Sequence, residues 1–282
     1  FLAHTDDPEQ DYIELYNHST QAVSIAGCVI SDDPDLDKYV IPGGTTIPAN
    51  GFVSFNQTTL GFSLSADGET LYFKNAARTR VIDCVRFDGQ ENGVSMGRWP
   101  DGADQFYRLL TKTPGTNNTA VRINPVVLNE LMYHPISEDD ADQYIELFNR
   151  SNGPVNLSGW TLGGGVSFTI PNGTTIAANG YLVIVNQRVR FLTNYPTVNP
   201  GIVLGDFGGN LSGRGERVTL CMPESLLSTN GSVIATNFFK IVMDEVTYGS
   251  GGRWPELADG GGSSLERIDP RANSRLPANW AA

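Results

Sequence analysis

The chain has 282 residues and a formal net charge of −12. Because phosphate binding requires clustered lysine and arginine, this acidic balance argues against a nucleic-acid partner and against adhesion to an anionic membrane surface. With 40% hydrophobic and 18% charged residues the composition fits a folded protein, and no apolar run is long enough to predict insertion into a membrane.

Short strands separated by turns are predicted along the first half of the chain. The 31 glycines and 16 prolines fall between short apolar runs, which is typical of β structure. Alternating hydrophobicity predicts a strand over residues 12–16. The Ala49-Asn50-Gly51 turn, whose Asn-Gly pair supplies positive φ angles, starts another strand at residue 52. Further strands are expected over residues 69–73 and 81–87.

The second half of the chain repeats the first. Residues 11–17 return as residues 143–149, and residues 41–52 return as residues 170–181, at offsets of 132 and 129 residues. A period of that length is that of a whole domain and not of a solenoid unit. We therefore predict two tandem domains, residues 1–118 and 119–282, joined by a short Pro-, Gly- and Asn-rich linker near residues 113–118.

Some segments differ between the copies. Phe1-Leu2-Ala3-His4 aligns with Leu131-Met132-Tyr133-His134, so the first strand of copy one is expected to be truncated, as in an excised fragment. In copy two, residues 188–195 predict a helical turn. An insertion near residues 224–237, rich in Ser, Thr and Asn, predicts a surface loop between strands over residues 217–222 and 240–248.

Copy two also contains an ordered set of motifs. These are Asn129-Glu130-Leu131, Tyr144-Ile145-Glu146-Leu147-Phe148-Asn149, Leu157-Ser158-Gly159-Trp160-Thr161-Leu162, and Ile170-Pro171 followed by Ala178-Asn179-Gly180-Tyr181. The set resembles the lamin tail domain family, in the form found in secreted bacterial proteins, and much of it recurs in copy one. The resemblance implies an all-β fold of two tandem immunoglobulin-like β-sandwich domains that carry no catalytic residues.

The copies depart from each other at two places. Copy one closes with Ser95-Met96-Gly97-Arg98-Trp99-Pro100, which resembles the family's C-terminal strand, whereas copy two closes differently with Ser264-Leu265-Glu266-Arg267. Cys28 stands where copy two has Trp160, which indicates a repacked core in copy one.

No catalytic or cofactor-binding residue is predicted. The only histidines are His4, His18 and His134, and two of them occupy equivalent strand ends where local hydrogen bonds explain them. This scatter fits neither a nucleophile paired with a base nor a zinc site. Glu14 and Glu146 recur at one repeat position, which indicates a shared structural role, although paired carboxylates that meet only in three dimensions stay open.

An acidic loop supplies the candidate metal ligands. Asp32, Asp33, Asp35 and Asp37 place four carboxylates within six residues, and carboxylate oxygens are the ligands that calcium prefers. The loop lacks the spacing and the glycine of an EF-hand, so a solvated loop of like charges is the alternative interpretation. A second acidic cluster, residues 138–142, is interpreted in the same way.

Three further patterns leave alternatives open. Trp99, Trp254, Trp280 and Tyr107 would form a sugar-stacking platform if exposed, or would pack at a domain seam or sandwich end. Cys28 and Cys84 either form a disulfide or are small buried hydrophobes. Eight Asn-x-Ser/Thr sequons are either glycan acceptors or turn residues. The sequons begin at Asn17, Asn56, Asn117, Asn149, Asn156, Asn172, Asn210 and Asn230.

These patterns predict a non-catalytic structural or interaction module of a larger secreted or cell-surface bacterial protein. Its expected partner is a protein or a cell-surface polysaccharide, and no oligomeric state is specified. The alternative is a pair of carbohydrate-binding accessory domains of a secreted enzyme. Specific function is expected in segments private to one copy or at the seam between the copies.

Overall fold

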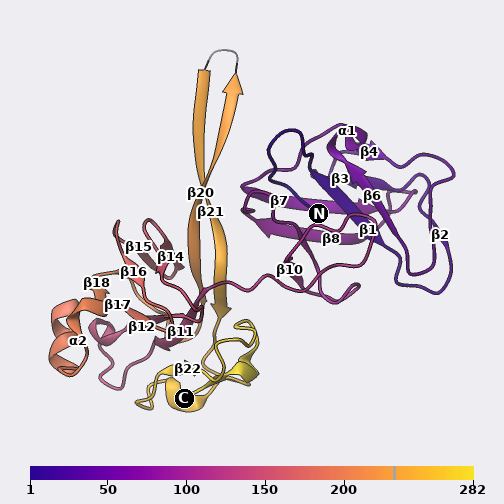
Figure 1. Cartoon of the computed structure of the whole chain (residues 1–282). Coiled ribbons are helices and arrows are strands. Elements are labelled where there is room, and N and C mark those ends of the chain that lie inside the picture. The colour runs from indigo at the N-terminus through magenta and orange to yellow at the C-terminus, as the bar shows by residue number, and fades with distance from the viewer. Residues whose placement is uncertain (231–232) are drawn as a thin grey trace. The chain divides into compact units, whose positions relative to one another are not determined.

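The computed structural model describes residues 1–230 and 233–282 and is built almost entirely of strands (Figure 1). The chain divides into two compact units: unit 1 comprises Phe1–Ile123 and Glu224–Ile241, and unit 2 comprises Asn124–Pro223 and Val242–Ala282. Among the described residues, none of the helices has the length and apolar character needed to cross a membrane.

Unit 1 forms its core between a two-stranded and a four-stranded sheet. The two-stranded sheet pairs β1 (Tyr12–Tyr16) with β6 (Phe52–Asn56), and the four-stranded sheet has the order β4-β3-β7-β8. The remaining elements are β2 (Val23–Ser24), β3 (Val29–Ser31), β4 (Tyr39–Val40), β5 (Thr46–Ile47), α1 (Gln57–Leu60), β7 (Gly68–Lys74), β8 (Val81–Asp88), β9 (Met96–Arg98) and β10 (Phe106–Arg108). Ile13 and Phe55 from the first sheet are buried with Ile30 and Leu71 from the second.

Unit 2 has two larger sheets, of order β18-β17-β12-β11-β22-β23 and β19-β15-β14-β20-β21. The strands of these sheets and of the small β13–β16 pair are β11 (Val126–Met132), β12 (Tyr144–Asn149), β13 (Val155–Asn156), β14 (Thr161–Gly164), β15 (Val166–Thr169), β16 (Thr175–Ile176), β17 (Tyr181–Val185), β18 (Val203–Gly205), β19 (Gly208–Gly209), β20 (Arg217–Asn230), β21 (Val233–Thr247), β22 (Leu265–Arg267) and β23 (Trp280–Ala281). The residues of β20 from Glu224 and those of β21 up to Ile241 are assigned to unit 1. Its helices are η1 (Asp140–Asp142), α2 (Arg188–Asn194), η2 (Pro200–Ile202), η3 (Glu256–Ala258) and η4 (Pro277–Asn279).

The internal repeat is a repeat of strand register. In β1 and β6, Tyr16 pairs with Phe52 and their rings stack at 4.7 Å. In β12 and β17, Phe148 pairs with Tyr181 at the same repeat position, with ring centroids 4.8 Å apart. Both Asn-Gly turns have the predicted positive φ, 49° at Asn50 and 53° at Asn179. The all-β, immunoglobulin-like class predicted from the sequence is therefore confirmed.

Both copies keep a buried asparagine at this strand end: Asn17 directly follows β1, and Asn149 is the last residue of β12. The Asn149 Nδ2 donates to the carbonyls of Gly153 (2.8 Å), Ile176 (3.0 Å) and Ala177 (2.9 Å). In unit 1 the Asn17 Nδ2 donates to three carbonyls at equivalent positions. Each amide therefore ties a strand end to the turn that precedes the next strand of its sheet.

The insertion near residues 224–237 is not the loop that the sequence predicts. Residues up to Asn230 continue β20 and residues from Val233 begin β21, and these two strands are neighbours in the five-stranded sheet (Figure 1). Ser, Thr and Asn indicate an exposed segment but do not exclude extended backbone, since Thr and the interspersed β-branched residues favour strands. The strands predicted on either side and the helical turn at α2 are confirmed.

The segment predicted as a linker is bonded to unit 1. The Gly115 amide donates to Glu14 Oε1, and the Asn118 Nδ2 donates to the Arg98 carbonyl at 3.0 Å. The division between the units falls after Ile123, a few residues beyond the predicted boundary at residues 118 and 119. Cys28 is buried and Cys84 is exposed, and the two do not form a disulfide.

Candidate functional site

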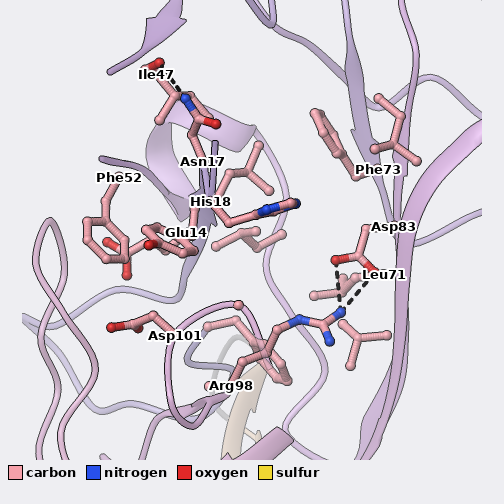
Figure 2. A pocket seen from close by; sticks show the side chains of 18 of the residues that line it. Glu14, Asn17, His18, Ile47, Phe52, Leu71, Phe73, Asp83, Arg98 and Asp101 are labelled. Carbon is pink, nitrogen blue, oxygen red and sulfur yellow. Dashed lines mark hydrogen bonds and ion pairs between the residues drawn. The ribbon is translucent and has the colours of Figure 1, made fainter. Parts of the chain in front are cut away.

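Unit 1 contains an open cavity of about 560 Å³ between its sheets (Figure 2). Its apolar wall includes Ile13 and Leu15 from β1 and Leu71 and Phe73 from β7. That volume lies within the roughly 300–1,000 Å³ of ordinary ligand pockets. Much of the cavity is lined by strands that both copies share, and the closing segment of copy one adds Asp101, Phe106 and Asn118.

An ion pair stands on one side of the cavity. The Arg98 Nη2 donates to both carboxylate oxygens of Asp83, at 3.0 Å each, and the pair faces the cavity beside Leu71 (Figure 2). The guanidinium is also held by the carbonyls of Ala103 and Asp104 and lies 4.4 Å from the Phe106 ring centroid. Its orientation is therefore fixed from several sides.

Carboxylates lie on the opposite side of the cavity. Burial raises the pKa of the Glu14 carboxyl, and the neighbouring Asp101 adds to this, while the Gly115 amide opposes it by donating to the carboxylate. Asp101 accepts from the Asn117 side chain (2.8 Å) and from the Asn118 amide (3.1 Å). The cavity thus has an apolar floor and polar groups of both charges at its rim.

The same ion pair exists in unit 2, where it is buried. The Arg267 Nη1 donates to Asp244 at 2.8 Å, with side-chain exposures of 3% and 10%. The corresponding exposures in unit 1 are 24% for Arg98 and 54% for Asp83. Since β9 and β22 place these arginines equivalently, the closing blocks of the two copies, which differ in sequence, correspond in structure.

Two short sequence patterns shared by the copies could have predicted this ion pair, although the sequence analysis did not use them. Asp83 and Asp244 each begin the pattern Asp-x-Val-x-aromatic, which ends at Phe87 and Tyr248. Arg98 and Arg267 each end a Ser-x-x-Arg segment. The offsets differ from those of the earlier repeats because copy two is longer between its strands, so the correspondence is visible only after the strands are matched.

The calcium candidates lie in an exposed loop outside the cavity. Asp32 pairs with Lys38 (2.6 Å), Asp37 pairs with Arg78 (2.8 Å), and Asp33 accepts from the Asp35 amide (2.8 Å). An ammonium group already occupies the loop: the Lys74 Nζ donates to the carbonyls of Pro34 and Leu36 at 2.7 and 2.9 Å. The calcium site expected from the sequence is not tested here, and calcium would have to displace that ammonium group.

The second acidic cluster, residues 138–142, also forms ion pairs within the protein. In the cluster at residues 138–142, Arg190 binds both Asp139 and Asp142 at 2.6 Å. Across the residues that the structure describes, no group of three or more His, Cys, Asp and Glu side chains is arranged to hold a metal ion. His4 Nδ1 lies 2.9 Å from the Gln90 carbonyl, and His134 Nδ1 lies 2.6 Å from Asp259, so both strand-end histidines make local hydrogen bonds.

Three carboxylates form a row across unit 2. Glu130 on β11 pairs in register with Glu146 on β12 and with Glu266 on β22. Burial, together with the charges of Glu130 and Glu266, raises the pKa of Glu146 to about 7, although a hydrogen bond from Asn129 opposes the shift. The Tyr144 hydroxyl donates to Glu130. These contacts indicate that Glu146, the residue that recurs as Glu14 in copy one, has a structural role in the sheet of unit 2.

The aromatic residues do not form one platform. Trp280 is buried, and its indole N–H donates to the Ser274 carbonyl at 2.8 Å, so it is a packing residue. Trp99 is exposed on unit 1. Tyr107 and Trp254 are partly buried. Among the sequons, the Asn17 and Asn149 amides are buried in hydrogen bonds and are not accessible as glycan acceptors, and the side chain of Asn230 lies outside the described part of the structure.

Comparison with known proteins finds a family model that matches part of the chain. The family model "Lamin Tail Domain" matches residues 119–250. This segment is therefore similar to the lamin tail domain, as the motifs of copy two predict. No curated protein matches the chain. A crystal structure of a DUF4876 family protein from Bacteroides thetaiotaomicron VPI-5482 is similar at 11% sequence identity and a TM-score of 0.32, covering 95% of this chain and 81% of that chain.

Proposed function

We propose that the chain is a non-catalytic interaction module of a larger secreted or cell-surface bacterial protein, and that its partner is a protein. Copy one is proposed to be a second lamin tail domain beside the one at residues 119–250. The observation that carries the proposal is the open cavity of unit 1, which is lined mainly by apolar side chains with a fixed ion pair.

The polar residues that recur in both copies support a binding role over a catalytic one. Asn17 and Asn149 hold turns, and the Arg98–Asp83 and Arg267–Asp244 pairs hold strand ends together. Each of these interactions therefore occurs at the same repeat position in both copies. Polar residues that keep the same hydrogen bonds and ion pairs in both copies stabilise the fold. A function specific to this chain would therefore come from the open cavity of unit 1.

The experiment is a comparison of partner classes on the full chain. We expect the chain to bind immobilised protein or peptide ligands and to bind no sugar on a glycan array at millimolar concentration. Substitutions at the cavity, such as Leu15→Asp, should abolish the binding to protein or peptide. Leu110→Asp, at an exposed position away from the cavity, is the matched control. Sugar binding that is abolished by Trp99→Ala would replace this proposal with the carbohydrate-binding alternative.

A further inference from the structure

A partly buried arginine in unit 2 is bonded to backbone carbonyls instead of a carboxylate. Arg150 directly follows β12, and its Nε donates to the Asn124 carbonyl at 2.7 Å while its Nη1 donates to the Pro270 carbonyl at 2.6 Å. Among the residues that the structure describes, no carboxylate forms a hydrogen bond or ion pair with this guanidinium. A guanidinium has five N–H donors, so three of them are left for a ligand.

The two bonds also fix where those donors lie. Asn124 leads into β11, and Pro270 follows β22, so the guanidinium is held by two segments of unit 2 that are far apart in the sequence. The backbone of Arg150 is fixed as well, since its amide donates to the Pro125 carbonyl at 2.9 Å. Because the planar fork is already oriented, a ligand would bind it with little further loss of side-chain entropy.

The charges around Arg150 leave one positive charge in excess. Burial lowers the pKa of the Arg150 guanidinium, and the like charge of Arg267 adds to this. Asp244 and Asp269 oppose the shift, whereas Arg271 reinforces it. Asp244 already pairs with Arg267 at 2.8 Å. Three arginines and two aspartates therefore leave a local charge of plus one, on a chain whose formal net charge is −12.

Arg271 supplies a second guanidinium without a partner. It is exposed, its backbone amide donates to Asp269 at 2.8 Å, and no described residue bonds to its side chain. It also comes directly after Pro270, the residue whose carbonyl holds Arg150. Other arginines of unit 2 are paired. Arg217 and Arg275, for example, both bind Glu245, at 2.6 and 2.8 Å.

We propose that Arg150 and Arg271 form a binding site for one carboxylate group, supplied by an acidic side chain of a partner protein. The planar fork of an arginine matches the two oxygens of a carboxylate. One excess positive charge balances a carboxylate, whereas a phosphate group, with a charge of about −1.5 to −2, would leave repulsion from Asp269 uncompensated. The site lies in unit 2, so this inference goes beyond the function proposed for the cavity of unit 1.

The loop that contains Arg271 favours a protein over a polysaccharide as the source of the carboxylate. Ile268 is 64% exposed and Leu276 is 51% exposed, and both belong to the loop between β22 and η4. Exposed aliphatic side chains beside arginines suit a protein surface, because interfaces combine apolar contacts with arginine. The expected ligand is therefore a glutamate or aspartate with apolar neighbours.

The test uses two capped tripeptides, Leu-Glu-Leu and Leu-Gln-Leu, which differ by one charge. Titration of the full chain, followed by NMR of the arginine Nε–H groups, should show Leu-Glu-Leu binding at Arg150 at millimolar concentration and Leu-Gln-Leu not binding. Arg150→Gln should weaken binding about tenfold or more, because hydrogen bonds to charged groups are the strong ones. Arg271→Gln, at an exposed position, should weaken it about threefold.

Arg214→Gln is the matched control. Arg214 is an exposed arginine of unit 2, and its neighbour Gly213 lies against His134, which follows the end of β11 opposite to Arg150. The variant removes the same charge and should leave the affinity for Leu-Glu-Leu unchanged. Arg150→Gln also removes two bonds to carbonyls, so Arg271→Gln, which breaks no side-chain bond, keeps the test decisive if the first variant unfolds.

Three results would overturn the site. These are equal binding of the two tripeptides, equal affinities of Arg271→Gln and the unsubstituted chain for Leu-Glu-Leu, and tighter binding at Arg150 of inorganic phosphate or galacturonic acid than of Leu-Glu-Leu. Tighter binding of galacturonic acid would assign the site to an acidic sugar instead. A chain that binds protein ligands through the cavity of unit 1 but does not bind Leu-Glu-Leu would keep the proposed function and lose this inference.

Discussion

Replacing the aspartate of each repeated ion pair by asparagine should have very different consequences in the two units. Asp244 accepts from the Leu128 amide (2.9 Å), from Arg267 (2.8 Å) and from the Ser274 hydroxyl (2.6 Å), and it is 10% exposed. Asp244→Asn conserves shape but leaves the Arg267 guanidinium buried without its counter-charge. Breaking a buried pair in this way costs about 3–5 kcal/mol.

Asp83→Asn is the matched control, since it removes the same charge from the same repeat position. Asp83 is 54% exposed, and an exposed ion pair contributes at most about 1 kcal/mol to stability. Calorimetry of the full chain should therefore show the transition of unit 2 lowered by roughly 10–20 °C in Asp244→Asn, and the transition of unit 1 nearly unchanged in Asp83→Asn. Equal shifts in the two variants would refute the claim that the pair is closed in one unit and open in the other.

Three further changes give separate tests. Asn149→Ala removes the side-chain amide whose Nδ2 donates to three carbonyls and should destabilise unit 2 by about 3 kcal/mol in urea unfolding, whereas the exposed Asn156→Ala should cost under about 1 kcal/mol. The pKa of Glu146 is raised to about 7, so the stability it contributes is present below pH 4.5 and is lost as the pH rises through 7. Glu146→Gln should therefore raise the melting temperature more at pH 8 than at pH 5, and an equal rise at both would contradict this. Because the Lys74 ammonium occupies the acidic loop, millimolar calcium and chelator should give the same melting temperature.

The fold was predictable because its local signals agree with one another. The Asn-Gly turns, the alternating strand at residues 12–16 and its return at residues 144–148 each predict strands, and their repetition fixes the domain plan. The insertion near residues 224–237 was predicted wrongly because polar composition reports exposure and leaves the backbone conformation open. Strand neighbours in a sheet are chosen by tertiary packing, which no local pattern specifies.

The candidate site was less predictable than the fold. Asp83 and Arg98 lie on different strands, and nothing in either segment alone shows that they meet. The acidic run at residues 32–37 is easier to recognise because its residues are adjacent in the sequence. Adjacency in the sequence does not show which side chains form a site in the folded chain. The structure distributes those carboxylates among Lys38, Lys74 and Arg78. The cavity is lined by residues from β1, β7, β8 and β9, which are far apart in the sequence and meet only in three dimensions.

The most direct measurement is hydrogen exchange of individual backbone amides by NMR. The account predicts that the amides of Glu14 and Tyr16 exchange much faster than those of Glu146 and Phe148, which β11 covers. Equal protection of the amides in the two units would contradict the account, in which β6 is the partner strand of β1 whereas β11 and β17 both pair with β12.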